Sequence, residues 1–478
     1  MCISLMHASA ILIYKGKQYM DFTQYKRIHC LGIGGIGLSA VAELLADNGH
    51  IVTGTDIKPS DVTRHLESIG IKVFTSHEPE NVEGVDAIVY SAAVSEENPE
   101  VVRARELGIP LFSRAQVLGA IMDRYENSVA ICGTHGKTTV TSMTSLILRN
   151  ANYKPTILVG GNLPQIHGNV EIGDGNTYFV TEACEYMDSF LQLRPSIGVI
   201  LNIDSDHLDY FKDMEHIVKS FSTFVEQIPK DGVIIAYGDN PFVKSILRDH
   251  RNKITYGYSE SNDFYAENMK FNESGFPCFD IYRKGHKVAS LELSVPGEHN
   301  VLNAMAAFVT ASFLKVDIPT IARTLKEYHG TNRRFDFNGV TDKGVMVIDD
   351  YAHHPTEIKA TLKAAKNVKH NKLWLVFQPH TYTRTKALFD EFVDAFQDTD
   401  VLILTDIYAA REKDVYNISS YKLMSAMKHK YPDREIYYVK DFEDIVSYIN
   451  KFAGKDDIAM TMGAGDVYKV GEMLLAKE

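Results

Sequence analysis

The amino-acid sequence predicts an α/β protein with three consecutive domains, each built on a mainly parallel sheet. Short apolar runs alternate with stretches of helical periodicity along most of the chain, which is the pattern of parallel α/β units. Two glycine-rich loops each stand between an apolar run and a helical pattern, where such units bind phosphate groups. A chain of 478 residues is also long enough for about three domains.

The composition excludes several classes of protein. Hydrophobic residues make up 45% of the chain and charged residues 23%, as in ordinary globular proteins. The net charge of −12 argues against nucleic acid as a partner, because nucleic acid is bound by basic surfaces. The five cysteines form no CxxC pair, which favours reduced cytoplasmic thiols over disulfides or a zinc site. No apolar run approaches the roughly 20 residues that span a bilayer, so we expect no membrane insertion.

The first domain is predicted at 21–126. The N-terminal extension at 1–20 lacks the basic start and the cleavage site of a signal peptide, and Met20 is an alternative start. Candidate strands of the first domain lie at 27–31, 51–55, 71–74 and 85–90.

A glycine-rich loop, LGIGGIG, follows the first candidate strand and opens a helix in a GxGxxG pattern. Asp56 ends the next candidate strand, 19 residues after Gly37. This fingerprint is typical of dinucleotide sites, but N–H groups at a helix N-terminus bind any diphosphate, including that of a UDP-sugar. We therefore predict a diphosphate site made of Gly32, Gly34, Gly35, Ile36, Gly37, Asp56 and Ser91.

The stretch VAICGTHGKTTV (129–140) is a second phosphate-binding loop, at the start of a central domain predicted at 127–332. It keeps the glycine, lysine and hydroxyl order of a Walker A loop, with two residues fewer between the glycines. We predict that Lys137 neutralises the β- and γ-phosphates and that the Thr138 hydroxyl ligates Mg²⁺.

Two further strand ends of the central domain carry groups suited to a metal. Glu182 ends the apolar run that begins at 178, and the run at 197–201 leads into NIDSDHLD, 202–209. Because the carboxyl ends of parallel strands share one edge of a sheet, both should face the nucleotide. His207 is the strongest candidate of the second loop, and Asp204, Asp206 and Asp209 are candidates for the site or for turn capping.

The rest of the chain completes this organisation. Strand-like alternation at 254–295 predicts a small antiparallel patch on the central domain, followed by an Ala-rich helix at 300–314 and a polar boundary at 330–338. The third domain is predicted at 333–478, with strands at 345–349, 373–377, 401–405, 436–439 and 458–461.

Six motifs, from the central loop onward, together resemble the Mur ligases. They are GTHGKTT, NIDSDHLD, PGEHNVLNAMAA (296–307), RRF (333–335), DDYAHHPTEI (349–358) and FQPHTYTRT (377–385). The resemblance implies a Rossmann-like UDP-binding domain, a P-loop ATPase domain and a Rossmann-like domain for an amino acid. It also implies ATP-dependent ligation of L-alanine to the carboxylate of UDP-N-acetylmuramate, through an acyl phosphate and a tetrahedral intermediate, in peptidoglycan precursor synthesis.

The resemblance further implies roles for single residues. The catalytic groups would be Lys137, His207, His353 and Arg384. ATP would be bound by Gly133, Thr134, His135, Gly136, Lys137, Thr138, Thr139, His299, Asn300, Asn303, Arg334 and Asp350. The substrate carboxylates would meet Tyr351, His380 and Arg384, and two Mg²⁺ ions would be held by Thr138, Glu182 and His207.

Three positions depart from the family pattern. Thr381 stands where many members have arginine, and TEACEYMDSF (181–190) keeps Glu182 but leaves the role of Glu185 open. Ser222 occupies the spacing at which related ligases carry a bridging carbamylated lysine, so we assign no carbamate.

Four alternatives explain parts of the sequence. A nicotinamide oxidoreductase accounts for the GxGxxG loop with Asp56, and an ATP-driven switch or motor accounts for the central domain. Folylpolyglutamate synthase shares the central domain but lacks the UDP-type loop. A ligase that recycles a ready-made tripeptide onto UDP-N-acetylmuramate shares most motifs, and only the C-terminal pocket would separate it. We expect a cytoplasmic protein that is a monomer or a weak homodimer.

Overall fold

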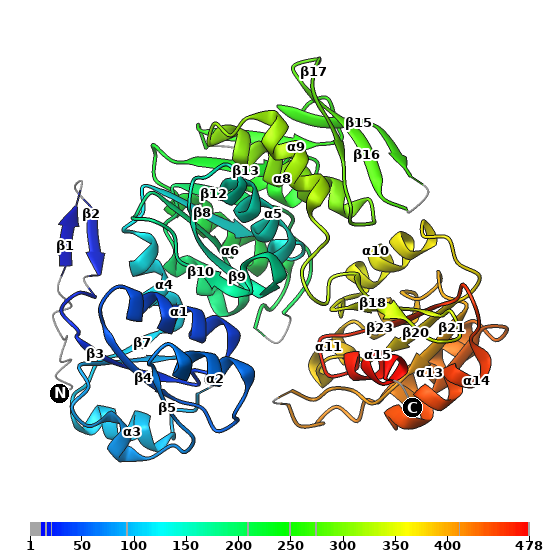
Figure 1. Cartoon of the computed structure of the whole chain (residues 1–478), viewed down its shortest axis with the longest axis horizontal. Helices are drawn as coiled ribbons and strands as arrows, with labels where there is room; N and C mark the ends of the chain where they lie inside the picture. Colours follow the sequence, from blue (N-terminus) through cyan, green and yellow to red (C-terminus); the bar gives the residue numbers. More distant parts are fainter. Residues whose placement is uncertain are drawn as a thin grey trace.

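The computed structural model describes residues 11–14, 17–20, 22–91, 94–207, 210–247, 250–272, 275–410 and 412–476, with side chains from residue 22 onward. Three α/β units, each with its own sheet, follow one another along the chain (Figure 1). The strands β1 (Ile11–Tyr14) and β2 (Lys17–Met20) form an antiparallel hairpin ahead of them. The remainder of the predicted extension and Asp209 lie outside the described residues.

The first unit is a five-stranded parallel sheet with the strand order β5-β4-β3-β6-β7. Its strands are β3 (Arg27–Leu31), β4 (Ile51–Thr55), β5 (Lys72–Phe74), β6 (Ala87–Tyr90) and β7 (Leu111–Ser113). Its helices are α1 (Ile36–Asp47), α2 (Asp61–Ser68), α3 (Pro99–Glu106) and α4 (Arg114–Met122), with a 3₁₀ turn η1 (Pro79–Val82). The strand order reverses beside β3, so the glycine-rich loop stands at the switch point where such sheets bind ligands.

The central unit is a ten-stranded sheet with the order β10-β9-β11-β8-β12-β13-β14-β15-β16-β17. The strands are β8 (Asn127–Cys132), β9 (Thr156–Leu163), β10 (Gly168–Glu171), β11 (Tyr178–Glu182), β12 (Ile197–Ile200), β13 (Val233–Tyr237), β14 (Lys253–Gly257), β15 (Phe264–Phe271), β16 (Pro277–Arg283) and β17 (His286–Glu292). The helices are α5 (Lys137–Asn150), α6 (Met214–Gln227), α7 (Pro241–Ile246), α8 (His299–Phe313) and α9 (Ile318–Glu327), with 3₁₀ segments η2 (Pro164–Ile166) and η3 (Tyr186–Gln192). The antiparallel patch is not separate, because β14 pairs in parallel with β15 and so joins it to the main sheet.

The C-terminal unit is a six-stranded sheet with the order β18-β19-β23-β20-β21-β22. Its strands are β18 (Asp336–Val340), β19 (Met346–Asp350), β20 (Leu373–Phe377), β21 (Val401–Leu404), β22 (Glu435–Tyr438) and β23 (Ile458–Met462). Its helices are α10 (Pro355–Lys366), α11 (Tyr382–Ala387), α12 (Phe389–Val393), α13 (Ser420–Lys430), α14 (Phe442–Phe452) and α15 (Tyr468–Leu475). All pairs are parallel except β18 with β19.

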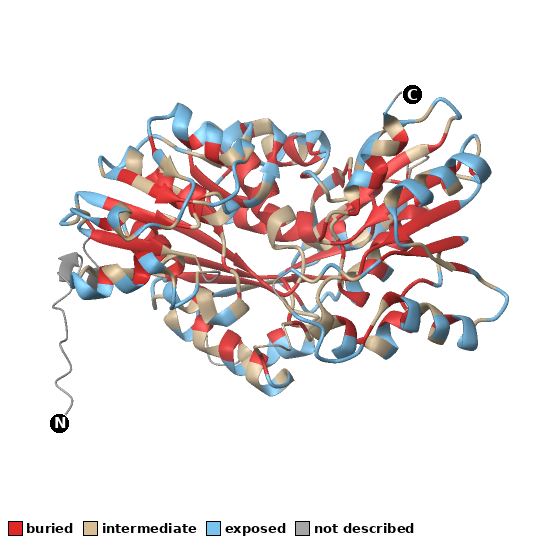
Figure 2. Ribbon diagram, turned by 90° about the horizontal axis from the view of Figure 1, so that it is seen from below, coloured by how far each residue is buried: buried red, intermediate tan, exposed pale blue. Residues whose placement is uncertain are grey.

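The parallel parts of the sheets lie between layers of helices, and their central strands are buried (Figure 2). Every residue of β12, β20, β21 and β23 is buried. Parallel strands covered on both faces read as continuous apolar runs, which explains why the sequence located them. The core of the first unit continues into one face of the central sheet.

Two further findings concern the described residues. None of the helices there is long and apolar enough to cross a membrane. The cysteines that the structure describes, Cys30, Cys132, Cys184 and Cys278, are free thiols.

Candidate active site

A cavity of about 1200 Å³ opens where the three units meet. Its lining includes Ile36 from the first unit, Lys137 and His207 from the central unit, and Tyr351 and Arg384 from the C-terminal unit. The central and C-terminal residues follow the carboxyl ends of parallel strands, where α/β sheets bind their ligands.

The phosphate-binding loop is shaped by its two glycines. Buried strand β8 ends at Cys132, and the chain then passes through Gly133 (φ 142°) and Gly136 (φ 90°) before α5 begins at Lys137. A Cβ atom at Gly136 would lie 2.6 Å from Oδ1 of Asn303 on α8. Only glycine therefore fits both the backbone conformation and the space at this position.

The Lys137 ammonium points back into its own loop. Nζ donates to the carbonyl oxygens of Gly133 (2.6 Å) and Thr134 (3.1 Å) and to both carboxylate oxygens of Glu185 (3.0 and 2.8 Å). Burial alone would lower the pKa of Lys137, but the adjacent Glu185 carboxylate outweighs it and raises this pKa. The loop thus presents a fixed positive charge beside a buried carboxylate.

The two glutamates after β11 occupy different places. Oε1 of Glu182 accepts from the Gly160 N–H at 2.6 Å, and Glu182 lines the large cavity. Oε1 of Glu185 lies 3.7 Å from Nε2 of His207. Glu185, rather than Glu182, is therefore grouped with Lys137 and His207.

The loop after β12 reaches the C-terminal unit through Asp206. Its Oδ1 accepts from Nε (3.2 Å) and Nη2 (3.1 Å) of Arg384. Burial would raise the pKa of Asp206, but the Arg384 guanidinium and the nearby histidines hold it far below its usual range. Arg384, predicted as a substrate contact, is thus also half of a buried ion pair between units.

His135 of the phosphate-binding loop forms a second bridge between these units. Its ring nitrogens face Asp204 (Nε2 to Oδ2, 3.3 Å) and Glu357 of α10 (Nδ1 to Oε1, 3.2 Å). Thr356 donates to the same oxygen of Asp204 at 2.8 Å. Burial would lower the pKa of His135, but the two carboxylates raise it to about 9. The charged imidazolium therefore connects the phosphate-binding loop to α10.

His354 has a structural place in this bridge. Its Nε2 donates to the Ser205 carbonyl at 2.7 Å, and its Nδ1 accepts from the Thr356 N–H at 3.2 Å, which caps α10. His135, Asp204 and His354 lie close enough together to hold a cation. The ring nitrogens of the two histidines are, however, already engaged in the contacts described above.

We expect the contact between these units to weaken in alkali. The pKa of His135 in the folded protein, about 9, lies above its ordinary 6.5, so its stabilisation is complete below pH 6.5 and is lost as the pH rises through 9. Thermal unfolding between pH 7 and pH 10 should show a falling midpoint. His135→Gln should have a lower midpoint at pH 7 and a flatter pH dependence, and a decline of unchanged steepness in that variant would contradict the assignment.

A second, mainly apolar cavity of about 460 Å³ lies beside the phosphate-binding loop. It is lined by Thr139, Tyr237, Phe242, Tyr256, Leu302, His299, Asn300, Asn303, Arg334 and Asp350, among others. Asn300 donates to the Pro296 carbonyl (2.7 Å) and Asn303 to Asn300 Oδ1 (2.9 Å). Burial lowers the pKa of His299 to about 4, so its ring is neutral. A mainly apolar pocket adjoining a phosphate site suits a purine ring.

Asp350 at the end of β19 organises the RRF segment. Its two oxygens accept from the N–H groups of Phe335 and Ala352, each at 2.7 Å. Burial raises the pKa of Asp350 to about 6, although nearby Arg334 opposes this. The Arg334 guanidinium lies 5.3 Å above the Tyr351 ring and borders both cavities.

The predicted carboxylate-binding residues cluster around Arg384. Nη1 of Arg384 lies 3.2 Å from Nδ1 of His380, whose ring stacks on Tyr408. Burial lowers the pKa of His353 to about 4 and that of His380 to about 3, so both rings are neutral. Thr381, at the position that departs from the family pattern, caps α11 through the Arg384 N–H at 3.4 Å.

The glycine-rich loop of the first unit is closed by Asp56. Oδ2 of Asp56 accepts from the Gly34 N–H at 2.9 Å, and a Cβ at Gly34 would lie 2.8 Å from that oxygen. Ser91 stands at the end of β6, where its Oγ would be 3.0 Å from a Cβ at Gly32. The predicted residues do come together, and Asp56 contacts the loop directly.

Arg114 also lies at the glycine-rich loop, although the sequence does not predict it as part of the diphosphate site. It begins α4, and its Nη1 would lie 3.1 Å from a Cβ at Gly37, so the guanidinium packs on the start of α1. Its guanidinium makes no hydrogen bond or ion pair with the residues that the structure describes. A cation beside a helix N-terminus that lacks a counter-charge favours an anionic ligand. The sequence alone gives no signal for this, because Gly37 and Arg114 meet only in the tertiary structure.

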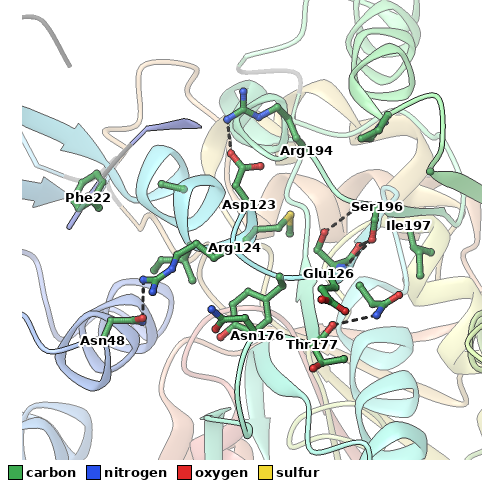
Figure 3. Close-up of a pocket in the computed structure, with 18 of the residues that line it drawn as sticks. Phe22, Asn48, Asp123, Arg124, Glu126, Asn176, Thr177, Arg194, Ser196 and Ile197 are labelled. Atoms are coloured by element: carbon green, nitrogen blue, oxygen red, sulfur yellow. Dashed lines mark hydrogen bonds and ion pairs between the residues drawn. The ribbon is translucent and has the colours of Figure 1, made fainter. Parts of the chain in front are cut away.

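Another cavity, of about 670 Å³, lies at the amino ends of β8, β12 and β13 (Figure 3). Arg124 there donates to Asn48 Oδ1 at 2.8 Å, and Arg194 pairs with Asp123. These contacts lie at the amino ends of the strands, whereas the phosphate-binding loop follows the carboxyl end of β8. The cavity is therefore separate from the candidate site.

Comparisons with known proteins agree with this geometry. Three family models match in chain order: the Mur ligase family, catalytic domain (27–126), the Mur ligase middle domain (131–311) and the Mur ligase, glutamate ligase domain (333–465). The chain belongs to the Mur ligase family. This assignment excludes the oxidoreductase and the switch or motor, each of which accounts for one unit.

The relatives of this Mur ligase cover almost its whole length. It is 49% identical over 458 residues to the UDP-N-acetylmuramate–L-alanine ligase of Acetivibrio thermocellus, covering 95% of this chain and 97% of that one. The enzyme of the same name from Alkaliphilus metalliredigens is 49% identical over 460 residues, covering 96% and 99%.

Solved structures are similar over the same span. The UDP-N-acetylmuramate–alanine ligase of Thermotoga maritima has a TM-score of 0.79 and 28% identity, covering 94% of this chain and 98% of that one. A murein peptide ligase of Psychrobacter arcticus has a TM-score of 0.70 and 26% identity, with the same coverage.

Proposed function

We propose that this Mur ligase joins L-alanine to the carboxylate of UDP-N-acetylmuramate, coupled to the conversion of ATP to ADP and phosphate, in peptidoglycan precursor synthesis. The observation that carries the proposal is 49% identity, over nearly the whole length of both chains, to ligases of that name. The cavity at the junction of the three units supports it, because a three-substrate ligation needs such a meeting point.

The proposal gives each unit one substrate. Residues 21–126 would bind the UDP moiety, with the diphosphate on the glycine-rich loop and Arg114 as an additional cation. Residues 127–332 would bind ATP, with the purine in the apolar cavity and the phosphates at Lys137. Residues 333–478 would bind L-alanine near Arg384. We further propose that the enzyme acts in the cytoplasm as a monomer or weak homodimer.

The reaction needs two steps because the carboxylate must be activated before the amine can attack it. A carboxylate is a poor acyl donor, so its oxygen attacks the γ-phosphorus of ATP, giving an acyl phosphate and ADP. The amine of L-alanine then attacks the carbonyl carbon, and phosphate leaves from the tetrahedral intermediate. Such transfers depend on positioning and charge neutralisation, which the Lys137 ammonium supplies at the phosphates. Arg384 would orient the carboxylate of L-alanine.

We propose that divalent cations, two Mg²⁺ as predicted, are held by Thr138, His207 and a glutamate. A hydroxyl and a carboxylate are ligands that Mg²⁺ accepts, and imidazole also suits other divalent ions. A bound cation neutralises charge on the transferring phosphoryl group. Glu185 fits better than the predicted Glu182, because Glu185 is the carboxylate that faces both Lys137 and His207.

Matched glutamate variants should decide between these two carboxylates. Glu185→Gln is expected to raise the Mg²⁺ concentration for half-maximal turnover by on the order of 10-fold or more, because a ligand charge is lost. Glu182→Gln should change it little, since Glu182 contacts the Gly160 amide. A titration of initial rates with Mg²⁺ measures both, and the reverse order of effects would restore Glu182 as the ligand.

Phosphate release tests the function itself. Purified protein with Mg-ATP and UDP-N-acetylmuramate should release phosphate with L-alanine, and only weakly with D-glutamate or L-Ala-γ-D-Glu-diaminopimelate. Glycine and L-serine would be included to define the tolerance of the amino-acid site. Release only with the tripeptide would assign the recycling reaction, and release with ATP alone would leave an ATPase without the proposed acceptor.

A further inference from the structure

The segments that carry Glu185 and His207 have an unusual backbone. Met187 (φ 52°), Asp188 (φ 53°) and His207 (φ 53°) adopt left-handed conformations without being glycine. Residues with side chains rarely adopt this conformation, and such strain persists only where surrounding contacts hold it. Some feature of the structure must therefore fix both segments.

Asp188 provides such contacts on both sides. Its Oδ2 accepts from the Tyr210 hydroxyl at 2.6 Å, its Oδ1 accepts from the Ser220 hydroxyl on α6, and its N–H donates to the Glu185 carbonyl at 3.0 Å. One carboxylate thus connects the turn after Glu185 to α6 and to the segment after His207.

Aromatic contacts complete the connection to His207. The Tyr186 ring packs 4.7 Å from the His207 ring and 6.3 Å from the Tyr210 ring. The Tyr210 N–H donates to the His207 carbonyl at 2.9 Å. These contacts leave the His207 imidazole little freedom to move. Because Tyr210 is hydrogen bonded to both Asp188 and His207, loss of the Asp188 carboxylate should allow the His207 ring to shift.

The same turn is anchored beneath by Phe190. This residue is fully buried, and its ring stacks on Phe224 of α6 at 5.0 Å between centroids. The fold of the turn therefore has an apolar anchor that is independent of Asp188. Loss of the Asp188 hydrogen bonds should loosen the two candidate ligands without unfolding the turn.

We propose that Asp188 is a positioning residue for the divalent cation, which fixes the separation between the Glu185 carboxylate and the His207 imidazole. This proposal depends on the proposed function in one respect: it takes Glu185 and His207 as ligands of the divalent cation. It assigns Asp188 no contact with substrate. Hydrogen-bonded partners of metal ligands commonly change metal affinity by 10- to 100-fold when removed.

Three variants and one control test this role. Asp188→Asn keeps the shape of the side chain and removes its charge, while Tyr210→Phe and Ser220→Ala each remove one donor. Thr223→Ala is the matched control, because the Thr223 hydroxyl lies on the same helix and donates to the Lys219 carbonyl at 3.1 Å. The readouts are Mn²⁺ binding measured by electron paramagnetic resonance and the Mg²⁺ concentration for half-maximal turnover, together with KM for each substrate.

We expect Asp188→Asn to weaken Mn²⁺ binding about 10-fold, with smaller losses for the two hydroxyl variants and none for the control. KM for UDP-N-acetylmuramate at saturating metal should stay unchanged. Wild-type Mn²⁺ affinity in Asp188→Asn, or in both hydroxyl variants if Asp188→Asn does not fold, would overturn the proposal. A parallel rise of every KM with a fall in thermal stability would also overturn it. Absence of ligase activity in the wild-type protein would instead overturn the proposed function, because Mn²⁺ binding is measured without turnover.

Discussion

Lys137→Ala is expected to lower kcat by on the order of 10²- to 10³-fold, because it removes a fixed positive charge from the transferring phosphoryl group. The ammonium is held by the Gly133 and Thr134 carbonyls and by Glu185, so its position in the loop is fixed before any ligand binds. Electrostatic stabilisation by a group already in position costs no reorganisation during the reaction. Single-turnover phosphate release measures the effect on chemistry directly.

The Lys137 variant also leaves Glu185 buried without its partner, which destabilises the loop for a reason unrelated to catalysis. The double variant Lys137→Met with Glu185→Gln separates the two effects, since it buries no unpaired charge. Its thermal stability should recover, and its kcat at saturating Mg²⁺ should stay below that of Glu185→Gln alone, which is the matched control because Glu185 is also a proposed metal ligand. A near-wild-type kcat in Lys137→Ala would refute the phosphate role.

The sequence located most strands because their burial on both faces makes them continuous apolar runs. The sequence does not single out four strands of the main units, and one of them, β10 (Gly168–Glu171), is a short edge strand without a fully buried residue. β7 (Leu111–Ser113) has three residues, too few for a pattern, and β9 (Thr156–Leu163) is interrupted by Gly160 and Gly161. β18 (Asp336–Val340) is a polar edge strand, exposed at several positions, so its sequence has the composition of a boundary segment.

The candidate site was predictable as a set of residues but not as a set of contacts. The phosphate-binding loop could be placed from its glycine, lysine and hydroxyl spacing, which depends on local geometry. The pairs His135–Glu357 and Arg384–Asp206 span 222 and 178 positions and join different units. Neither pair can be predicted from a local sequence pattern, because each pair forms only through the arrangement of the units in space. Arg114 was missed for the same reason.

Arg384→Ala is expected to lower kcat/KM for L-alanine by on the order of 10²-fold or more, because truncating a buried charge contact costs about 2–5 kcal/mol. The same change leaves the Asp206 carboxylate, 7% exposed, without the guanidinium that holds it ionised. Loss of one partner of a buried pair is itself destabilising by about 3–5 kcal/mol. The single variant therefore mixes a substrate effect with a loss of contact between units, and both would appear as lower activity.

The double variant Arg384→Met with Asp206→Leu resolves this mixture. Apolar replacement of both partners of a buried pair is often neutral for stability, so the thermal midpoint should return towards that of the wild type. If Arg384 binds the carboxylate of L-alanine, KM for L-alanine stays high in the double variant while KM for ATP is restored. If the guanidinium only joins the two units, restoring their contact restores both constants together. The two KM values, measured at saturating UDP-N-acetylmuramate, therefore distinguish a substrate contact from a link between units.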